Sequence, residues 1–300
     1  ALFLLGFGGL FGAGGMLLSL LAGSNVLLTG GMLKMLLFGG MSLLLSLAGY
    51  AAYLNSFQGK LFFDDLSSVI GNPNLQVFSN PRTRWTWDGW VNAFGAQIDT
   101  PFAGRPIVSF TFALNHWWAF KAHPAHIPEF YGVLPPHYWY YHFVNYCFHI
   151  AVAIVLWHFL RRTMRAPNVA HYTGSHADLW ATAISVLWVV HPLNTETVVY
   201  ITQRTEQVLS LFLLLTMYFS SRSIDARAAW ARWAWYIGAV VACALGMASK
   251  ENMVGVPLLV ALTIVVASAT VALVVAVRLT ASFNAAAVAP ARLAAVSLML

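Results

Sequence analysis

Long apolar runs restrict the fold of this chain more than any other feature. The clearest run is "HYWYYHFVNYCFHIAVAIVLWHFLRR", which opens on aromatic residues and closes on Arg161 and Arg162. About 20 apolar residues let a helix cross the hydrocarbon core of a bilayer, where only helices and closed barrels satisfy their backbone hydrogen bonds. The alternating ten-residue strands of a barrel are not visible. The runs therefore predict membrane-spanning helices.

The composition agrees with this interpretation. Of 300 residues, 59% are hydrophobic and only 9% are charged, and the mean hydropathy is +0.70, well above the range of soluble domains. We predict an integral, multi-pass membrane protein, with an all-α fold in which about seven spans form a polytopic transmembrane helical bundle. Three regions follow from the hydropathy: N-terminal transmembrane segments at 1–57, a large loop at 58–136, and a transmembrane helical bundle at 137–300.

The 58–136 loop is too polar to span a bilayer, yet it is rich in Trp and Phe, the residues that favour a membrane interface. Within it, "RPIVSFTFALNHWW" has Pro106 at a plausible helix start and apolar residues near helical spacing. We expect an amphipathic helix lying on the membrane surface.

Arginine clusters set the expected orientation. They follow the ends of the internal spans at Arg161, Arg162, Arg165, Arg222, Arg227 and Arg232. Since Lys and Arg near spans favour the cytoplasmic side, one alternating topology places the 58–136 loop and the "HPLNTETVVYITQR" and "SKEN" turns on the extracytoplasmic face. Most of the unusual polar residues therefore converge on that face. No basic run suited to DNA or RNA is present, so we expect no nucleic-acid partner.

"LFFDDLSSVIGNP" sets two adjacent carboxylates, Asp64 and Asp65, at the start of the loop. One interpretation is an interfacial cap, because a carboxylate at a membrane exit costs little when it reaches water. The other is a general base or metal ligand, because a carboxylate beside apolar surface has a raised pKa and can accept a proton from a hydroxyl. Both interpretations stay open from the residues alone.

The "HPLNTETVVYITQR" turn and the two residues after it carry His191, Glu196, Arg204 and Glu206, and the "SKEN" turn carries Lys250 and Glu251. These groups suit an ion pair that joins helix ends, or a site for an anion such as phosphate, since Arg presents a planar fork of donors.

His142, Asn145 and His149 share one face of the following span. Their spacing is poor for zinc, and hydrogen bonding between helices is the favoured role. We assign no metal ligands, and no cofactor follows from the residues; a divalent metal stays open.

Five motifs in order resemble one known family. "FFDD…NP", "RPIVSFTFALN", "YHFVNYCFH", "HPLNTETVVYITQR" and "SKEN", over about residues 50–260, are similar to the membrane part of the transmembrane and tetratricopeptide-repeat-containing family of the GT-C glycosyltransferase superfamily. The resemblance implies a GT-C-like fold, and an enzyme that moves a sugar from a polyprenyl-phosphate carrier to an acceptor hydroxyl on the extracytoplasmic face.

The resemblance also implies roles for individual residues. Asp64 or Asp65 would be the base, and Arg204, Lys250 and Arg105 would neutralise the lipid phosphate as it leaves. The family's other polar motifs correspond here to His191, Glu196 and Glu251, which we count with the substrate-binding residues. The implied partners are membrane lipid, the polyprenyl-phosphate sugar donor and an acceptor that the sequence does not identify.

A second class of function stays open. The family's tetratricopeptide array does not occur within these 300 residues. The alternative is a non-catalytic structural subunit derived from this fold, which packs with other membrane subunits in a photosynthetic or respiratory complex. A transporter is less favoured, because the polar groups gather on one face rather than at mid-membrane.

Overall fold

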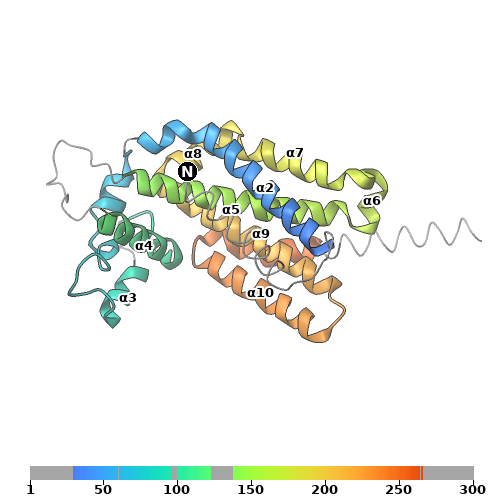
Figure 1. Cartoon of the computed structure of the whole chain (residues 1–300). Helices are drawn as coiled ribbons and strands as arrows, with labels where there is room; N and C mark the ends of the chain where they lie inside the picture. The colour runs from blue at the N-terminus through green and yellow to red at the C-terminus, as the bar shows by residue number, and fades with distance from the viewer. Residues whose placement is uncertain (1–29, 60, 96–99, 123–137, 264, 266–300) are drawn as a thin grey trace, which may run out of the picture. The chain divides into compact units, whose positions relative to one another are not determined.

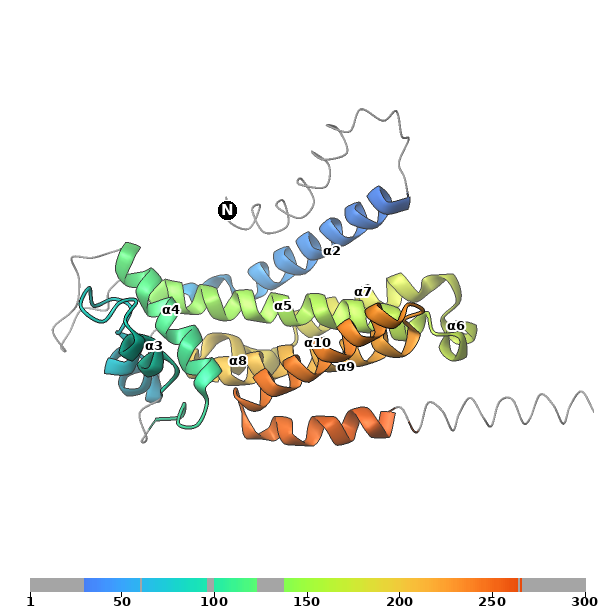
Figure 2. The same ribbon diagram turned by 90° about the horizontal axis from the view of Figure 1, so that it is seen from below.

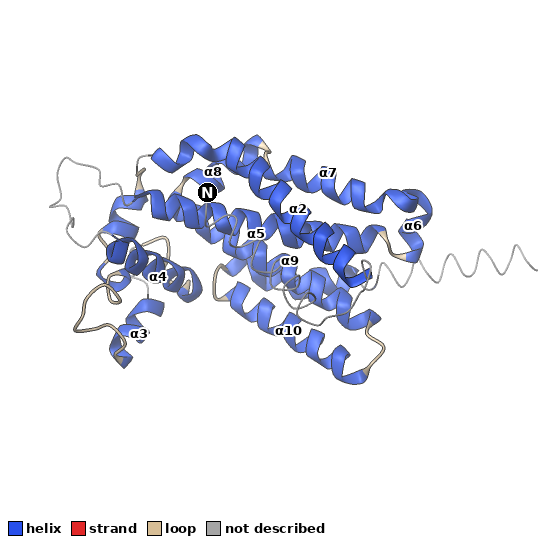
Figure 3. Ribbon diagram, in the orientation of Figure 1, coloured by secondary structure: helices blue, strands red, loops and turns tan. Residues whose placement is uncertain are grey.

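The computed structural model describes residues 30–59, 61–95, 100–122, 138–263 and 265. These residues form helices and connecting turns, with no strand among them (Figure 3). The predicted all-α class is therefore confirmed for this part of the chain. The chain divides into two compact units, Ala1–Met253 and Val254–Leu300, and the description below concerns the first. In the second, residues 256–263 are helical.

Five helices form the bundle of the first unit. They are α2 (Gly30–Tyr53), α5 (Tyr138–Met164), α7 (Ala177–Val189), α9 (Arg204–Asp225) and α10 (Ala229–Met247). Figures 1 and 2 show α5 in the middle of the bundle, and it packs against α2, α7 and α9, while α10 packs against α9. α5 is also the longest helix of the described residues.

The other helices connect those of the bundle. Before α5 lie η1 (Leu54–Gln58), η2 (Asp65–Ile70), η3 (Pro73–Leu75), α3 (Trp87–Phe94) and α4 (Pro106–Ala122). After it come α6 (Pro167–Thr173), η4 (Gly174–His176), η5 (Pro192–Asn194), α8 (Thr195–Val199), η6 (Ile201–Gln203) and η7 (Glu251–Gly255). The region expected to be a loop with short helices thus contains several.

Three helices of the described residues are long and apolar enough to cross a membrane: Leu36–Gln58, Tyr138–Met164 and Ile201–Asp225. Ala177–Val189 and Glu251–Thr263 are shorter apolar helices. These spans support a membrane protein. The count of about seven, the three-region division and the face on which 58–136 lies stay predictions, and the end runs at 1–29 and 266–300 lie outside the described residues.

Local sequence explains where two loop helices begin. α4 begins at Pro106, as predicted, because proline has no N–H to lose in the first turn and its fixed φ suits a helix. α3 begins after Thr86, whose hydroxyl accepts a hydrogen bond from Gly89 N at 3.1 Å. Asp88 in that first turn adds a favourable charge at the positive end of the helix dipole.

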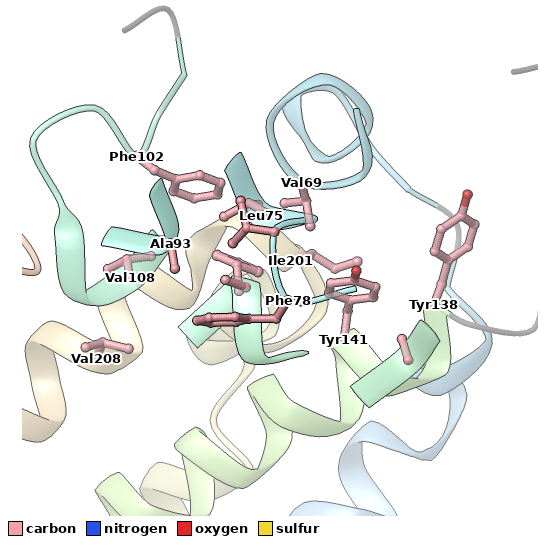
Figure 4. Packing of buried hydrophobic residues seen from close by; sticks show 14 residues of the cluster. Val69, Leu75, Phe78, Ala93, Phe102, Val108, Tyr138, Tyr141, Ile201 and Val208 are labelled. Carbon is pink, nitrogen blue, oxygen red and sulfur yellow. The ribbon is translucent and has the colours of Figure 1, made fainter. Parts of the chain in front are cut away.

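The loop helices pack onto the bundle through one hydrophobic cluster. Figure 4 shows Phe78, Phe102 and Leu75 from the loop region beside Ile201 and Tyr141 from the bundle. All five side chains are buried. A second cluster joins α2, α5 and α7 and includes Leu45, Tyr146, Ile150 and Val189. The first cluster is what holds the loop segment against the N-terminal ends of α5 and α9.

The two ends of the bundle differ chemically. α3, α4 and α8 lie at one end, and α6 and the α9–α10 connection lie at the other (Figures 1 and 2). At the second end, Arg162 bonds to Ser221 and Asp225, and Arg161 pairs with Asp178 at 2.7 Å. The arginine clusters at the ends of α5 and α9 therefore meet, as one alternating topology requires.

Candidate functional site

The "FFDD" stretch is a tight turn closed by two hydrogen bonds. Asp65 N donates to Phe62 O at 3.0 Å, and Phe62 N donates to the Asp65 carboxylate oxygen Oδ2 at 3.1 Å. This reciprocal pair leaves Phe63 and Asp64 at the tip of the turn. Phe63 has φ of 41°, in the left-handed region that a bulky side chain rarely adopts.

Asp65 points inward and fastens this turn to the bundle. Its side chain is buried, with 1% exposure, and its second carboxylate oxygen accepts a 3.0 Å hydrogen bond from Thr202 N in η6. Burial raises the pKa of Asp65, and the hydrogen bonds from Phe62, Thr202 and Ile201 oppose that shift. Since both oxygens already accept backbone N–H groups, Asp65 is placed to hold the turn against η6.

Asp64 differs from its neighbour. It is exposed, and within the described residues its carboxylate makes no hydrogen bond or ion pair. The adjacent carboxylates that the sequence could not tell apart therefore have different surroundings: one is buried and engaged, the other is free at a turn tip.

Arg204 lies fully buried at the first residue of α9. Its Nε donates to Asn145 Oδ1 at 2.7 Å, and its Nη2 donates to Asn115 Oδ1 at 2.7 Å. Longer bonds reach the carbonyl oxygens of Tyr141 (3.3 Å) and Thr111 (3.4 Å). No carboxylate pairs with it within the described residues. The guanidinium is thus held by neutral oxygens from α4 and α5. Its predicted contact with a lipid phosphate stays a prediction.

A continuous series of hydrogen bonds joins Arg204 to Asp65. Asn145, which accepts from Arg204, donates through Nδ2 to Tyr200 O at 3.3 Å and Ile201 O at 3.2 Å. The next residue, Thr202, donates to Asp65. The expected hydrogen bonding between helices from this face of α5 is confirmed, since His149 Nε2 also lies 2.9 Å from Val189 O.

The "SKEN" turn meets the beginnings of α4 and α9. Lys250 pairs with Glu206 on α9, and Arg105, one residue before α4, pairs with Glu251 at 3.0 Å. Ile107 N also donates to Ala248 O at 3.2 Å. Hydrogen bonds from its own backbone N–H and from Arg105 hold the pKa of Glu251 below its usual range. Two cations and two carboxylates therefore form a partly exposed group at this end of the unit.

The two remaining predicted residues, Glu196 in α8 and His191 just before η5, are exposed. Glu196 Oε1 accepts a hydrogen bond from Gln203 Nε2 at 3.2 Å, which ties α8 to η6. His191 Nδ1 accepts from Leu193 N at 3.2 Å and caps η5.

The described residues contain no group of three or more His, Cys, Asp or Glu side chains that could hold a metal ion. The divalent metal left open by the sequence stays a prediction, and the mechanism below uses none.

η6 and the start of α9 bring the predicted residues together. Asp65 and Glu196 contact η6, and Lys250 contacts α9 two residues after Arg204. Sequence reasoning missed Asn115 and Thr202 as members of this network. Asn115 lies within the quoted "RPIVSFTFALNHWW" motif, and a polar residue on an otherwise apolar helix is the signal that could have identified it.

Comparison with known proteins confirms the resemblance that the motifs indicated. The chain is 27% identical over 219 residues to the protein O-mannosyl-transferase TMTC2 of Mus musculus, a match that covers 70% of this chain and 22% of that protein. It is 27% identical over 191 residues to the protein O-mannosyl-transferase TMTC1 of Homo sapiens, covering 62% and 18%. The protein O-mannosyl-transferase F38B6.6 of Caenorhabditis elegans is 27% identical over 184 residues, covering 58% and 22%.

These matches extend over about a fifth of the length of the relatives. No family model matches the chain, and no solved structure matches it. By their names the relatives transfer mannose to proteins.

Proposed function

We propose that this chain, a relative of protein O-mannosyl-transferases, is a membrane-embedded glycosyltransferase. It moves a sugar, mannose by analogy with the relatives' names, from a polyprenyl-phosphate carrier to a hydroxyl of a protein acceptor on the extracytoplasmic face. The observation that carries the proposal is that motifs far apart in the sequence gather at one end of the bundle, around η6 and the start of α9.

Asp64 is the base in this proposal, and Asp65 positions it. A general base must come within hydrogen-bond reach of the hydroxyl that it deprotonates. The raised pKa of Asp65 would suit a base, but its 1% exposure and two backbone hydrogen bonds leave a substrate no access. Asp64 is exposed on the same turn, so accessibility decides between the two.

Arg105 and Lys250 stabilise the leaving phosphate. Each is partly exposed and paired with a carboxylate, Glu251 or Glu206, and can therefore exchange that partner for a phosphate oxygen. Arg204 already uses its donors inside the protein, so in this proposal it supports η6, and its predicted contact with phosphate would need a rearrangement.

The proposed reaction is a single displacement at the anomeric carbon. The acceptor oxygen forms a bond to the anomeric carbon of the sugar while the bond from that carbon to the phosphate oxygen breaks. The hydroxyl proton passes to the Asp64 carboxylate, and the polyprenyl phosphate leaves with the bonding electron pair. Arg105 and Lys250 offset the charge that grows on that phosphate, a contribution that increases where water is excluded. Attack opposite the leaving group would invert the anomeric configuration.

The bundle offers a place for the carrier's hydrocarbon tail. A cavity of about 350 Å³ lies between α2 and α5, with Leu211 of α9 in its wall. Its lining is mainly apolar and includes Phe38, Leu43 and Ile154. An isoprenoid chain gains free energy from such a surface, so the cavity supports a lipid-linked donor.

The test uses the full chain in lipid nanodiscs with polyprenyl-phosphate mannose radiolabelled in the sugar. Binding of this donor is measured by native mass spectrometry, and transfer is measured with unfolded polypeptides rich in Ser and Thr. We expect the wild type to bind the donor and transfer label. Asp64→Asn should keep binding and lose at least about a hundredfold in transfer, the scale of general-base catalysis.

Asp65→Asn is the companion variant. Its amide can accept only one of the two backbone N–H groups, so we expect a loosened turn and a smaller loss of transfer. Full transfer by both variants would overturn the assignment of this turn. A wild-type chain that binds no donor, and that co-purifies stoichiometrically with other membrane subunits, would replace the enzyme by the structural-subunit alternative.

A further inference from the structure

The tip of the Phe62–Asp65 turn carries a feature that the base assignment does not use. Phe63 is 82% exposed and Phe62 is 63% exposed. Their ring centroids lie 4.8 Å apart with an angle of 78° between the rings, an edge-to-face pair. Neither belongs to a hydrophobic cluster of the described core. The rings therefore face outward, directly beside Asp64.

The turn holds Phe63 in a conformation that its own preferences oppose. With φ of 41°, the backbone of Phe63 is strained, because a side chain with a Cβ disfavours the left-handed region. The reciprocal hydrogen bonds between Phe62 and Asp65 hold the backbone in this conformation. Thr202 N anchors the same carboxylate to η6. A strained, exposed aromatic on an anchored turn is a fixed surface, and strained positions cluster at functional sites.

We propose that Phe63, supported by Phe62, is the platform on which the pyranose ring of the sugar substrate stacks. This inference rests on the proposed function and deepens it by assigning the residue that recognises the sugar. One face of a pyranose presents C–H groups of slightly positive charge, which suit the negative face of an aromatic ring. The hydroxyl groups at the sugar's rim suit the Asp64 carboxylate, which accepts hydrogen bonds.

The neighbouring carboxylate favours a sugar over the bilayer as the occupant. Insertion of Phe63 into the hydrocarbon region would carry Asp64 toward it, and a charged carboxylate is strongly disfavoured in that region. A sugar meets the ring and the carboxylate together without that penalty. The pair of side chains thus matches a ligand that is apolar on one face and hydroxylated at its edge.

The test measures sugar binding by the full chain in lipid nanodiscs. Methyl α-D-mannopyranoside is the probe, and saturation-transfer difference NMR reports which of its C–H protons contact the protein. We expect a clear signal for the wild type and for Phe63→Trp, which keeps an aromatic face. Phe63→Leu should bind about fivefold more weakly or worse, because it stays apolar but has no ring.

Two further variants are controls. They distinguish the loss of sugar binding at Phe63 from a loss of folding and from the removal of any exposed aromatic ring. Phe63→Gly relieves the left-handed strain, so it should unfold at the wild-type temperature or above and still lose the signal. Tyr172→Leu removes an equally exposed ring, at 85%, from α6 at the opposite end of the bundle, and it should bind like the wild type. Unchanged signals from both Phe63→Leu and Phe63→Gly would overturn the proposal.

Placement in the bilayer is the competing outcome. 4-Cyanophenylalanine at position 63 should keep its fluorescence when the nanodisc lipids carry a nitroxide label, and strong quenching would overturn the sugar platform.

The base assignment and the sugar platform can be contradicted independently. Asp64→Asn should retain the sugar signal while losing transfer, so intact transfer in that variant contradicts the base assignment only. Intact binding in the Phe63 variants contradicts the platform only.

Discussion

Arg204 donates from Nε to Oδ1 of Asn145 at 2.7 Å, and neither side chain is exposed to solvent. The bond joins the first residue of α9 to α5, about two turns after the start of that helix. Because the Asn145 amide also donates to the carbonyl oxygens of Tyr200 and Ile201, it sets the path of the chain that delivers Thr202 to Asp65. One buried amide therefore supports both a guanidinium and the anchor of the candidate site.

Replacement of Asn145 should be costly. Asn145→Leu removes an acceptor from a buried cation and two N–H donors to backbone carbonyls, so we expect a loss of about 3 kcal/mol in the free energy of unfolding. Thermal and denaturant unfolding in detergent would measure it. Asn92→Leu, on the exposed surface of α3, is the matched control and should change stability by less than about 0.5 kcal/mol. Equal effects of the two changes would contradict the role of this amide.

The burial of His116 on α4 should make the free energy of unfolding depend on pH. Its Nδ1 lies 2.8 Å from Ser79 Oγ, and burial lowers the pKa of His116 to about 4. The unfolded chain takes up a proton near pH 6.5, whereas the folded chain stays neutral until pH 4. Stability is therefore full above pH 6.5 and is lost as the pH falls toward 4, by at most about 3 kcal/mol.

Unfolding temperatures across that range would check this prediction. His116→Asn keeps a polar side chain near Ser79 and does not titrate, so its profile should be flatter between pH 6.5 and 4. A slope as steep as that of the wild type would assign the pH dependence to other groups.

At Gly49, α2 lies close to both α5 and α7. A Cβ atom at this position would lie 2.8 Å from Ile150 Cδ1 and 3.0 Å from Val189 Cγ1. Small residues at such crossings let membrane helices approach closely. Gly49→Leu should separate α2 from α5 and α7 and lower the unfolding temperature by several degrees. Gly40→Leu, where nothing lies within 4 Å, should leave it unchanged.

Glu251 should control the affinity of Arg105 for phosphate. Glu251→Gln frees the guanidinium from its carboxylate partner, so binding of polyprenyl phosphate should become a few-fold tighter, while Arg105→Gln should weaken it. Titration of the nanodisc-embedded chain with polyprenyl phosphate, followed by native mass spectrometry, would compare them. Weaker binding in Glu251→Gln would show that the carboxylate itself contacts the ligand.

The sequence predicted the elements whose cause is local. Apolar runs identify the helices at Tyr138–Met164 and Ile201–Asp225, and Pro106 identifies the start of α4, because hydropathy and backbone preference depend on neighbouring residues. It also predicted that the polar face of α5 would bond to other elements. Five ordered motifs indicated the protein O-mannosyl-transferase relatives.

The tertiary structure decided which polar groups are free. Asp64 and Asp65 are equivalent in the sequence, and only the turn that closes at Phe62 and meets Thr202, 137 positions away, buries one and exposes the other. The role of Arg204 was equally ambiguous, since a basic residue at the start of a helix can bind an anionic ligand or form structural hydrogen bonds within the protein. Its burial among Asn115 and Asn145 depends on how α4 and α5 pack. Contacts over such separations are set by the packing of whole helices, which no local pattern encodes.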